Sequence, residues 1–402
     1  MILVIADSKM KAGDNGEYFY EYVRANHPDD KLYFVISANS TDYNRLRKKG
    51  FNLIDTDNGY IKYIFEKSDY ILTSKCQYPF GTEIHSRYYD KSVFLNHGIS
   101  SNVNHVNGYF GNIIDNYFKY TRVASDNDKN ILINTFGMKK SDIIVTGFAR
   151  WDNLIKKNLM RANHNKPHIL ITFHWRYGEL KSDSRKFFKS DYLKNINKLL
   201  NCDEIKKLSQ KCEITFMYHA MFSKYSNYFK VPYYINDGSK LQFQDMLVDA
   251  DAIVTDFSSN AYEMAVIGKP TFYYIPDCDY VINNIKEYDV KSLKENCIGK
   301  FCNNQDELIS TIDSFASGEF ELTSDNKNNI FNLIRNADLN NCDRIYNYLV
   351  NELENRKMSS TEVKEEKIIH TGGIWNKAMK MKAMVDEGSK KRIKVGDKFI
   401  FV

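Results

Sequence analysis

Histidines, arginines and serines follow apolar, strand-like runs at several places in this sequence, and such side chains can hold and react with a phosphate ester. The stretch "DAIVTDFSSNAYEMAVIGKP" (251–270) reaches Asp256, then Ser258 and Ser259, and then an apolar-periodic segment. This order predicts a buried strand that turns into a helix. The first turn of a helix carries unpaired N–H groups and a partial positive charge, so it binds anions. Two hydroxyls there could hold phosphate oxygens, although one of them could instead only cap the helix.

Asn260 and Glu263 offer a second way to cap this helix. An Asn followed three residues later by Glu fits a capping pattern. If that pair forms the cap, both serine hydroxyls remain for a ligand. No GxGxxG and no GxxxxGK[ST] occurs in the chain, so the expected phosphate site is neither a dinucleotide fingerprint nor a P-loop.

Three histidines and two arginines also follow strand-like runs. A single histidine at a strand end is more often structural than catalytic, but a set that recurs in both halves of the chain is harder to explain by packing. Ligands of parallel sheets bind at the carboxyl ends of the strands. We therefore expect this set to meet across one cleft. The set and its neighbours are His97, Gly98, Arg150, Asp152, His174, Arg176 and His219.

Two further patterns bear on metals. "PDCDY" (276–280) resembles a metal-binding DxD, but the pattern is short and lies in a predicted loop, so we interpret Asp277 and Asp279 as solvated carboxylates. The seven cysteines show no CxxC pair and no spacing that combines them with histidine. This usage suits a reducing cytosol and predicts no zinc site.

The elements that must position these residues alternate along the chain. Strand-like and helix-like segments alternate over about the first 350 residues, which predicts parallel sheets covered by helices on both faces. A polar, basic stretch at 156–168 interrupts the alternation. We therefore predict an α/β fold of two Rossmann-like, doubly wound domains that face a cleft. The strand-like runs are 1–7, 31–37, 45–55, 69–74, 91–98, 117–125, 143–148, 166–175, 212–220, 233–237, 251–257 and 270–276, and the longer helical runs are 190–210, 241–250 and 333–357.

The domain boundaries follow from this alternation and from a change in composition. We predict one Rossmann-like domain at 1–160 and a second at 161–356. Residues 357–402 are expected to form a small basic C-terminal appendage, with a helix near 373–387 and a strand pair near 391–402.

Charge is unevenly distributed over the 402 residues. The net charge is +5, yet the segment from Arg356 onward carries 12 Lys and Arg against 6 Asp and Glu, so the rest is close to neutral. The body shows no basic stripe, and we expect no nucleic-acid partner. The tail could be a solvated appendage, or it could bind an anionic membrane surface through a mixed apolar and basic face. That face would comprise Trp375, Ala378, Met379, Met381, Lys382 and Met384.

The sequence predicts a cytoplasmic protein. "MILVIADSK" lacks a basic segment before its apolar residues and a small-residue cleavage site, so we interpret it as a buried strand rather than a signal peptide. No apolar run approaches the roughly 18 residues of a spanning helix. With the basic tail, this favours a peripheral position on the inner face of the cytoplasmic membrane.

Taken in order, these motifs resemble the CDP-glycerol glycerophosphotransferase family, the polymerases and primases of teichoic acids and teichoic-acid-like capsules. The resemblance covers roughly residues 10–350 and rests on "DNGEYFYEYV", "FLNHGIS", "VTGFARWDNL", "ILITFHWR", "FMYHAMF" and "LVDADAIVTDFSS". It implies a glycosyltransferase-B-like (GT-B-like) fold. The first half would then face the acceptor and the second half would bind the nucleotide donor.

The resemblance also implies roles for single residues. His97 looks like the general base, and His219 is similar to a contact for a phosphate or leaving group. Arg150 and Arg176 look like pyrophosphate ligands. We accordingly expect catalytic roles for His97 and His219 and substrate contacts from Gly98, Arg150, Asp152, His174, Arg176, Asp256, Ser258, Ser259 and Glu263.

The implied reaction moves glycerol phosphate from CDP-glycerol to a hydroxyl of a teichoic-acid-like, capsular or lipid-linked acceptor and releases CMP. Guanidinium groups and helix N–H groups can stabilise the developing charge, so we expect neither cofactor nor metal. One alternative is a nucleotide-sugar glycosyltransferase of the same fold, which would release UDP or GDP from a sugar donor. The other is a non-catalytic polymer-binding protein, and the presence of every reactive side chain above argues against it.

Overall fold

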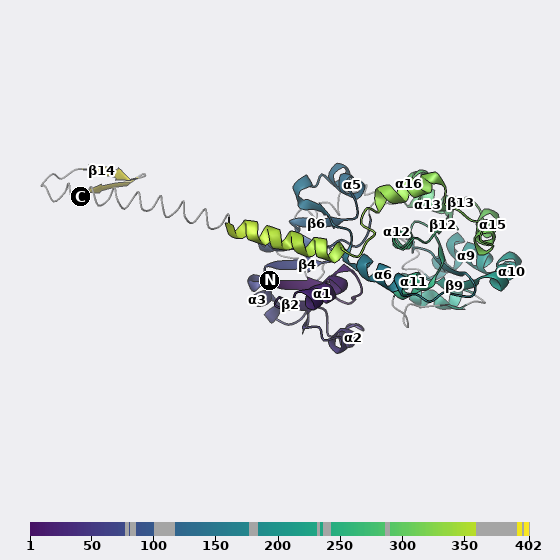
Figure 1. Cartoon of the computed structure of the whole chain (residues 1–402), viewed down its shortest axis with the longest axis horizontal. Helices are drawn as coiled ribbons and strands as arrows, with labels where there is room; N and C mark the ends of the chain where they lie inside the picture. The colour runs from purple at the N-terminus through teal and green to yellow at the C-terminus, as the bar shows by residue number, and fades with distance from the viewer. Residues whose placement is uncertain are drawn as a thin grey trace. The chain divides into compact units, whose positions relative to one another are not determined.

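The computed structural model describes residues 1–76, 80, 86–99, 117–176, 184–230, 234–235, 243–285, 290–358, 392–395 and 398–401. The chain divides into two compact units, Met1–Ile345 and Tyr346–Val402. The first unit contains two large parallel sheets, drawn mainly in purple and blue for the first and in teal and green for the second (Figure 1).

The first sheet has seven parallel strands in the order β3-β2-β1-β4-β5-β6-β7. Its order reverses between β1 and β4, as in a Rossmann fold, and ligands bind outside the carboxyl ends of the strands at such a reversal. The strands are β1 (Ile2–Ala6), β2 (Lys31–Val35), β3 (Leu53–Ile54), β4 (Tyr70–Thr73), β5 (Ser92–Phe94), β6 (Tyr120–Val123) and β7 (Ile143–Val145).

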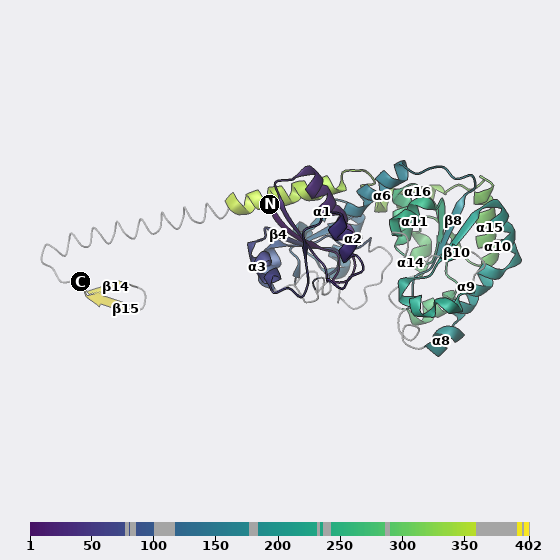
Figure 2. The same ribbon diagram turned by 90° about the horizontal axis from the view of Figure 1, so that it is seen from below.

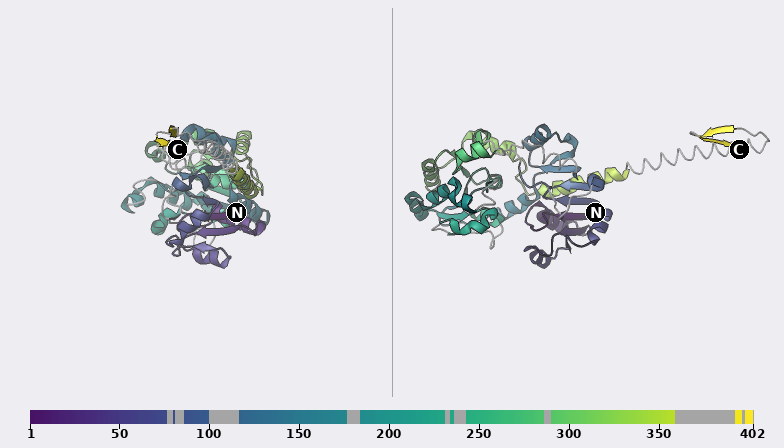
Figure 3. Two further views of the ribbon diagram at one scale, coloured as in Figure 1. Left: turned by 90° about the vertical axis from the view of Figure 1, so that its left-hand side faces the viewer. Right: turned by 180° about the vertical axis from the view of Figure 1, so that it is seen from behind.

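The second sheet repeats this topology with six parallel strands in the order β10-β9-β8-β11-β12-β13. Its reversal lies between β8 and β11, so a second ligand position is expected beside the ends of these two strands. Figure 3 shows both sheets from two further directions. The strands are β8 (His168–Thr172), β9 (Glu213–Met217), β10 (Tyr234–Ile235), β11 (Ala252–Thr255), β12 (Thr271–Tyr274) and β13 (Lys300–Cys302).

Helices connect the strands of the first sheet. Ser125 caps α5 by accepting a hydrogen bond from the backbone N–H of Asp128, and Gly137 ends the helix in the left-handed region, a common helix ending. The described helices here are α1 (Asn15–Asn26), α2 (Tyr43–Lys48), α3 (Tyr60–Lys67), α5 (Asp126–Phe136) and α6 (Ala149–Leu159), with 3₁₀ segments at Ser86–Lys91 and Lys140–Asp142.

The second half contains more helices than the sequence predicted. The run predicted as one helix at 190–210 is divided at Cys202, whose extended backbone separates two helices. The described helices are α8 (Ser184–Lys189), α9 (Asp191–Asn201), α10 (Asp203–Lys211), α11 (Phe243–Asp249), α12 (Asn260–Val266), α13 (Cys278–Asn284), α14 (Val290–Glu295), α15 (Gln305–Ala316) and α16 (Ser324–Leu333), with a 3₁₀ segment at Ala220–Tyr228.

The strands of the second sheet are buried on both faces. Ile169 and Ile171 of β8 pack in one hydrophobic cluster with residues of α9, α10 and α15, whereas Leu170 packs in the other with residues of α6, α11 and α12. Figure 2 shows α11 on one side of this sheet and α10 and α15 on the other. The continuous apolar runs in the sequence therefore reflect a sheet covered on both faces.

Helix α6 joins the two halves. Trp151 is fully buried and stacks edge-on against Phe148, and the same cluster contains residues of α11 and α12. Lys157 of α6 also pairs with Asp245 of α11. The predicted boundary at residue 160 falls directly after this helix, and the boundaries themselves remain predictions.

The helix predicted at 333–357 begins later than expected. α16 ends at Leu333, and the next helix occupies 341–358. The intervening segment "NADLNN" favours turns, and the Asp338 carboxylate accepts a hydrogen bond from the backbone N–H of Asn340. Arg344 then donates to the carbonyl of Thr146, so the start of this helix contacts the first half of the unit.

The second compact unit contains the antiparallel pair β14 (Arg392–Val395) and β15 (Lys398–Phe401), as predicted for 391–402. The helix predicted near 373–387 lies outside the described residues. Within the described parts of the chain, no helix is both long and apolar enough to cross a membrane.

Candidate functional site

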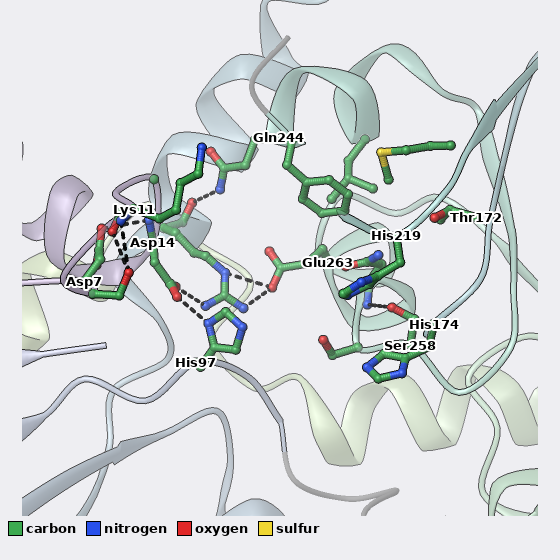
Figure 4. Close-up of a pocket in the computed structure, with 18 of the residues that line it drawn as sticks. Asp7, Lys11, Asp14, His97, Thr172, His174, His219, Gln244, Ser258 and Glu263 are labelled. Carbon is green, nitrogen blue, oxygen red and sulfur yellow. Dashed lines mark hydrogen bonds and ion pairs between the residues drawn. The ribbon is translucent and has the colours of Figure 1, made fainter. Parts of the chain in front are cut away.

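A cavity of about 500 Å³ lies where loops of both sheets meet (Figure 4). Residues after β1, β4 and β5 line it from the first half, and residues after β8, β9 and β11 line it from the second. His97 and Ser258 therefore face one space, as the sequence predicted. The charged and imidazole-bearing lining residues are Asp7, Lys11, Asp14, Lys75, His97, Arg150, His174, His219 and Glu263.

The turn before His97 directs its ring into this cavity. Asn96 has a left-handed backbone (φ 65°), a conformation that Asn tolerates better than most residues. Its side-chain oxygen accepts a hydrogen bond from the N–H of His97 (2.6 Å), and its amide donates to the carbonyl of Arg122 (3.1 Å). These bonds fix the loop against β6, and the His97 side chain remains 59% exposed.

A chain of charged groups runs from His97 across the cavity wall (Figure 4). One carboxylate oxygen of Asp14 contacts Nδ1 of His97, and the other accepts from Nη1 of Arg150 at 2.9 Å. Arg150 also donates to Glu263 from Nε at 3.1 Å and from Nη2 at 2.5 Å. The indole of Trp151 donates to the same Glu263 oxygen. The predicted contact residues Arg150 and Glu263 are thus each other's partners, and Asp14 joins them to His97.

Electrostatics keeps Asp14 and Arg150 ionised. Burial acts to raise the pKa of Asp14, but the charges of His97 and Arg150 outweigh it and hold that pKa well below its usual range. Burial likewise opposes the charge of Arg150, yet Glu263 and Asp14 raise the pKa of this guanidinium. Two carboxylates therefore balance the positive charge of Arg150. This pairing weakens the attraction of its guanidinium for a bound phosphate.

Asp7 holds the loop that carries Asp14. It is buried at the end of β1 and accepts hydrogen bonds from the N–H groups of Asp14, Gly16 and Glu17 and from the hydroxyl of Ser74. A Cβ on Gly16 would lie 2.6 Å from the Asp7 carboxylate, so this close approach requires glycine. Burial, followed by the charge of Asp14, raises the pKa of Asp7 to about 7.

The start of α12 differs from the predicted cap. Ser259 occupies the N-cap position without a side-chain cap bond, and Asn260 is the first helical residue. Ser258 accepts a long hydrogen bond from the N–H of Asn260 (3.4 Å). The predicted Asn260–Glu263 capping pair is wrong, because Glu263 binds Arg150 instead. Both serines line the cavity, and the backbone of Gly98 lies against Ser259.

Two histidines form the opposite wall. The rings of His174 and His219 lie 5.3 Å apart between centroids. Burial lowers the pKa of each to about 4, and the neighbouring charges of Arg176 for His174 and Lys75 for His219 act in the same direction. Both imidazoles are therefore neutral at pH 7. Nδ1 of His174 lies 2.8 Å from the carbonyl of Trp175, which assigns the proton to Nδ1.

Arg176 and Asp256 do not line the cavity. The Arg176 guanidinium is fully buried and binds Asp256, Asp277 and the carbonyl of His174. The expectation that Arg176 binds pyrophosphate is wrong here, because its donors bind residues at the ends of three neighbouring strands. Asp277 is correspondingly buried, which corrects its interpretation as a solvated carboxylate. Asp279 is exposed, as predicted.

Asp152 also has a structural role. Its carboxylate accepts hydrogen bonds from the N–H groups of Asn341 (3.0 Å) and Cys342 (2.8 Å), where the helix at 341–358 begins. It is absent from the cavity lining. The expectation that functional residues follow the carboxyl ends of strands, here called the strand-end rule, placed Asp152 correctly after β7. It could not show that the helix at 341–358 would occupy the carboxylate oxygens of Asp152.

Two lysines that were not predicted as site residues, Lys11 and Lys75, also line the cavity. Lys75 follows β4 and therefore obeys the strand-end rule, so this signal was present in "DYILTSK". Lys11 lies in the loop after β1, and its ammonium donates to the hydroxyl of Thr41 at 3.1 Å. Among the described side chains, no group of three or more His, Cys, Asp or Glu is arranged to hold a metal ion.

Sequence comparison places these features among known proteins. A family model described as CDP-glycerol:poly(glycerophosphate) glycerophosphotransferase matches residues 1–351. The minor teichoic acid biosynthesis protein GgaB of Bacillus subtilis is 26% identical over 379 residues, 89% of this chain and 40% of that protein. The teichoic acid ribitol-phosphate polymerase TarL of Staphylococcus aureus is 23% identical over 341 residues, 78% of this chain and 56% of that protein. The chain thus spans about half the length of these relatives.

Solved structures show the same fold. The wall teichoic acid polymerase TagF superposes with a TM-score of 0.61 at 14% identity, covering 89% of this chain and 90% of the TagF chain. A UDP-GlcNAc 2-epimerase from Neisseria meningitidis gives a TM-score of 0.51 at 13% identity, covering 87% of this chain and 99% of that chain. The predicted GT-B-like α/β fold is confirmed.

Proposed function

The chain belongs to the CDP-glycerol:poly(glycerophosphate) glycerophosphotransferase family, and from this premise we propose that it transfers glycerol phosphate from CDP-glycerol to a hydroxyl of a polymer or lipid-linked acceptor. The acceptor is a teichoic-acid-like or capsular chain, and CMP is the second product. The observation that carries this proposal is the convergence of His97 with Ser258, Ser259, His174 and His219 on one cavity.

In the proposed reaction the acceptor hydroxyl attacks the β-phosphorus of the donor. A P–O bond forms to the acceptor oxygen, the bond from that phosphorus to the bridging oxygen breaks, and CMP leaves with the bridging oxygen. His97 takes the hydroxyl proton as general base. Positioning and charge stabilisation supply most of the rate in phosphoryl transfer, and here both come from groups on the two walls of the cavity.

The second wall suits a diphosphate. The hydroxyls of Ser258 and Ser259 supply donors, and the neutral imidazole of His219 supplies another to the leaving phosphate. The ammonium of Lys75 lies close enough to His219 to depress its pKa, so it can neutralise charge that develops on the same phosphate. Oε2 of Glu263 is buried without a hydrogen-bond partner among the described residues, and it can accept a bond from a substrate hydroxyl.

We propose that the reaction needs no metal ion, because lysine, serine and histidine donors can together stabilise the negative charge of the phosphates. Turnover in excess EDTA tests this directly. Activity equal to that of the untreated enzyme is expected. If activity is lost in EDTA and restored by Mg²⁺ or Mn²⁺, metal independence is overturned, but the identity of the donor is not affected.

A donor panel tests the function. The protein is incubated with a soluble acceptor fragment and CDP-glycerol, CDP-ribitol, UDP-sugars or GDP-sugars, and released CMP, UDP and GDP are separated. CMP release with CDP-glycerol, together with acceptor extension by one glycerol phosphate, is expected. Preference for CDP-ribitol, whose polyol matches the ribitol-phosphate polymerase TarL, would keep the reaction but change the polyol. Release of UDP or GDP would identify a glycosyltransferase.

A further inference from the structure

The segment Asp14–Asn15, which opens α1, has no role in the function proposed so far. It begins the stretch "DNGEYFYEYV" and lies in the first half, on the His97 side of the cavity. Asn15 is fully buried, although an amide at the start of a helix is usually exposed to water. A buried polar side chain needs partners. The Asp14 carboxylate caps α1 by accepting from the N–H of Asn15, and the other side-chain partners of this pair belong to the His97 loop or to α6.

Asp14 and Asn15 connect the His97 loop to α6 through two sets of contacts. The side chains meet through the Asp14 carboxylate, which contacts His97 with one oxygen and Arg150 with the other. The backbones meet through Asn15, whose side-chain oxygen accepts from the N–H of Arg150 (3.1 Å) and whose amide donates to the carbonyl of Asn96 (2.8 Å). The positions of the imidazole and of the guanidinium are therefore set by adjacent residues of one helix start.

The chemistry of the carboxylate decides which nitrogen of His97 carries the proton. An ionised carboxylate is an acceptor only, so it requires an N–H on the Nδ1 that faces it. The neutral ring then presents the lone pair of Nε2, the nitrogen that does not contact Asp14. An Nε2 lone pair is what a general base needs.

Arg150 ensures that Asp14 remains an acceptor. A carboxylate beside one imidazole alone could be protonated when the ring accepts a proton, but Asp14 also faces a guanidinium that stays charged. Glu263, from the other half of the unit, balances the charge of Arg150 as well. Asp14 is thereby held as an anion that can stabilise an imidazolium.

We propose that Asp14 is a positioning residue that fixes His97 in the Nδ1–H tautomer and stabilises the imidazolium formed when Nε2 takes the acceptor proton. This inference rests on the proposed function, in which His97 is the general base. During the transfer the proton moves from the acceptor hydroxyl to Nε2, the Nδ1–H remains bonded to Asp14, and Asp14 itself takes no proton.

A double-mutant cycle tests the role in catalysis. We expect Asp14→Asn, which keeps the shape but can donate as well as accept, to lower kcat about 10²-fold with the KM for the donor changed less than about threefold. His97→Ala is expected to lower kcat about 10²–10⁴-fold. In the His97→Ala background, Asp14→Asn should cost less than about threefold more, because residues that act as one unit are not additive. Equal costs in both backgrounds would overturn the inference.

A matched variant controls for loss of a carboxylate from this region. Asp42 accepts from the N–H of Ala12 in the same loop and pairs with Arg45, but it does not contact His97. Asp42→Asn is expected to keep kcat within about threefold of the wild type. A loss as large as that of Asp14→Asn would assign the effect to the loop and overturn the role proposed for Asp14.

A spectroscopic test is independent of activity. With ¹⁵N-labelled histidine at pH 8.5, the signals of His97 are assigned by their loss in His97→Gln. The wild type should show the Nδ1–H tautomer, and Asp14→Asn should shift His97 toward the Nε2–H tautomer. The same tautomer in both proteins would overturn the inference. If the chain fails to use any CDP-polyol, the proposed function fails while this spectrum still decides the role of Asp14.

Discussion

At the scale of single residues, the charge of the cavity depends on lysines more than on arginines. Arg150 is balanced by Asp14 and Glu263, and Arg176 is buried between two carboxylates. Lys75 lines the cavity and is near enough to His219 to lower the pKa of that imidazole. The family resemblance implied that Arg150 and Arg176 bind pyrophosphate, a group that suits the donor geometry of arginine. It could not show that acidic partners would already occupy those donors.

Lys75→Met is therefore expected to lower kcat/KM about 10- to 100-fold, the scale of one charged hydrogen bond. Steady-state kinetics with CDP-glycerol measures this change. Lys9→Met serves as the control, because Lys9 pairs with Asp57 on the surface and does not line the cavity. Equal kinetics for Lys75→Met and the wild type would remove Lys75 from the phosphate site.

The neutral histidines predict how stability changes with pH. The pKa values of His174 and His219 are lowered to about 4 by burial and by nearby cations, whereas an unfolded histidine titrates near 6.5. Between these values the unfolded chain binds protons that the folded chain does not, so stability falls as the pH drops from about 6.5 to about 4. His219→Gln should lose less unfolding free energy than the wild type between pH 7 and 4.5 in urea titrations. Equal losses in the two proteins would show that His219 does not cause the effect.

At the scale of elements, the sequence predicted strands better than helix boundaries. Every predicted run from 69–74 through 270–276 contains a strand of the two sheets, since strands buried on both faces produce continuous apolar segments. The strand-like run predicted at 45–55 is wrong over its first residues, which belong to α2, and only Leu53–Ile54 forms a strand there. β13 and the helices α13 to α16 were missed. β13 is only Lys300–Cys302 and begins with a charged residue, so its apolar signal is weak. The break between Leu333 and residue 341 was missed because the apolar spacing continues across an Asn- and Asp-rich turn.

Gly147, between β7 and α6, is predicted to tolerate no other residue. Its φ is +74°, and a Cβ would lie 1.7 Å from Oδ1 of Asn341, which Arg344 also holds by a hydrogen bond. Gly147→Ala should cost more than about 2 kcal/mol in denaturant unfolding. Gly318→Ala is the matched control, because its φ is +76° but nothing lies within 4 Å of its Cβ. That variant should cost only about 1 kcal/mol, and equal costs for the two would contradict the steric argument.

At the scale of the whole molecule, the strand-end rule predicted that residues from two sheets share one cavity, but not how they connect. His97 and Ser258 were predicted to meet because each follows a strand of its own sheet. The link through Asp14, Arg150 and Glu263 depends on how α6 packs against both halves. No spacing in the sequence encodes that packing. The same limit applies to Asp152, whose partners lie almost 190 residues away in the chain.

The basic segment at 357–402 leads to a prediction for the full chain. Its excess of five positive charges should attract anionic lipid, at about 1 kcal/mol for each Lys or Arg that reaches the surface. Deleting 357–402 is expected to weaken cosedimentation with phosphatidylglycerol vesicles and to leave turnover on a soluble acceptor unchanged. Because screening acts on exposed charges, salt should release the full chain from these vesicles, and phosphatidylcholine vesicles should bind neither protein. Equal binding of both proteins to the anionic vesicles would contradict a membrane role for the segment, and a parallel loss of soluble turnover would assign it to catalysis instead.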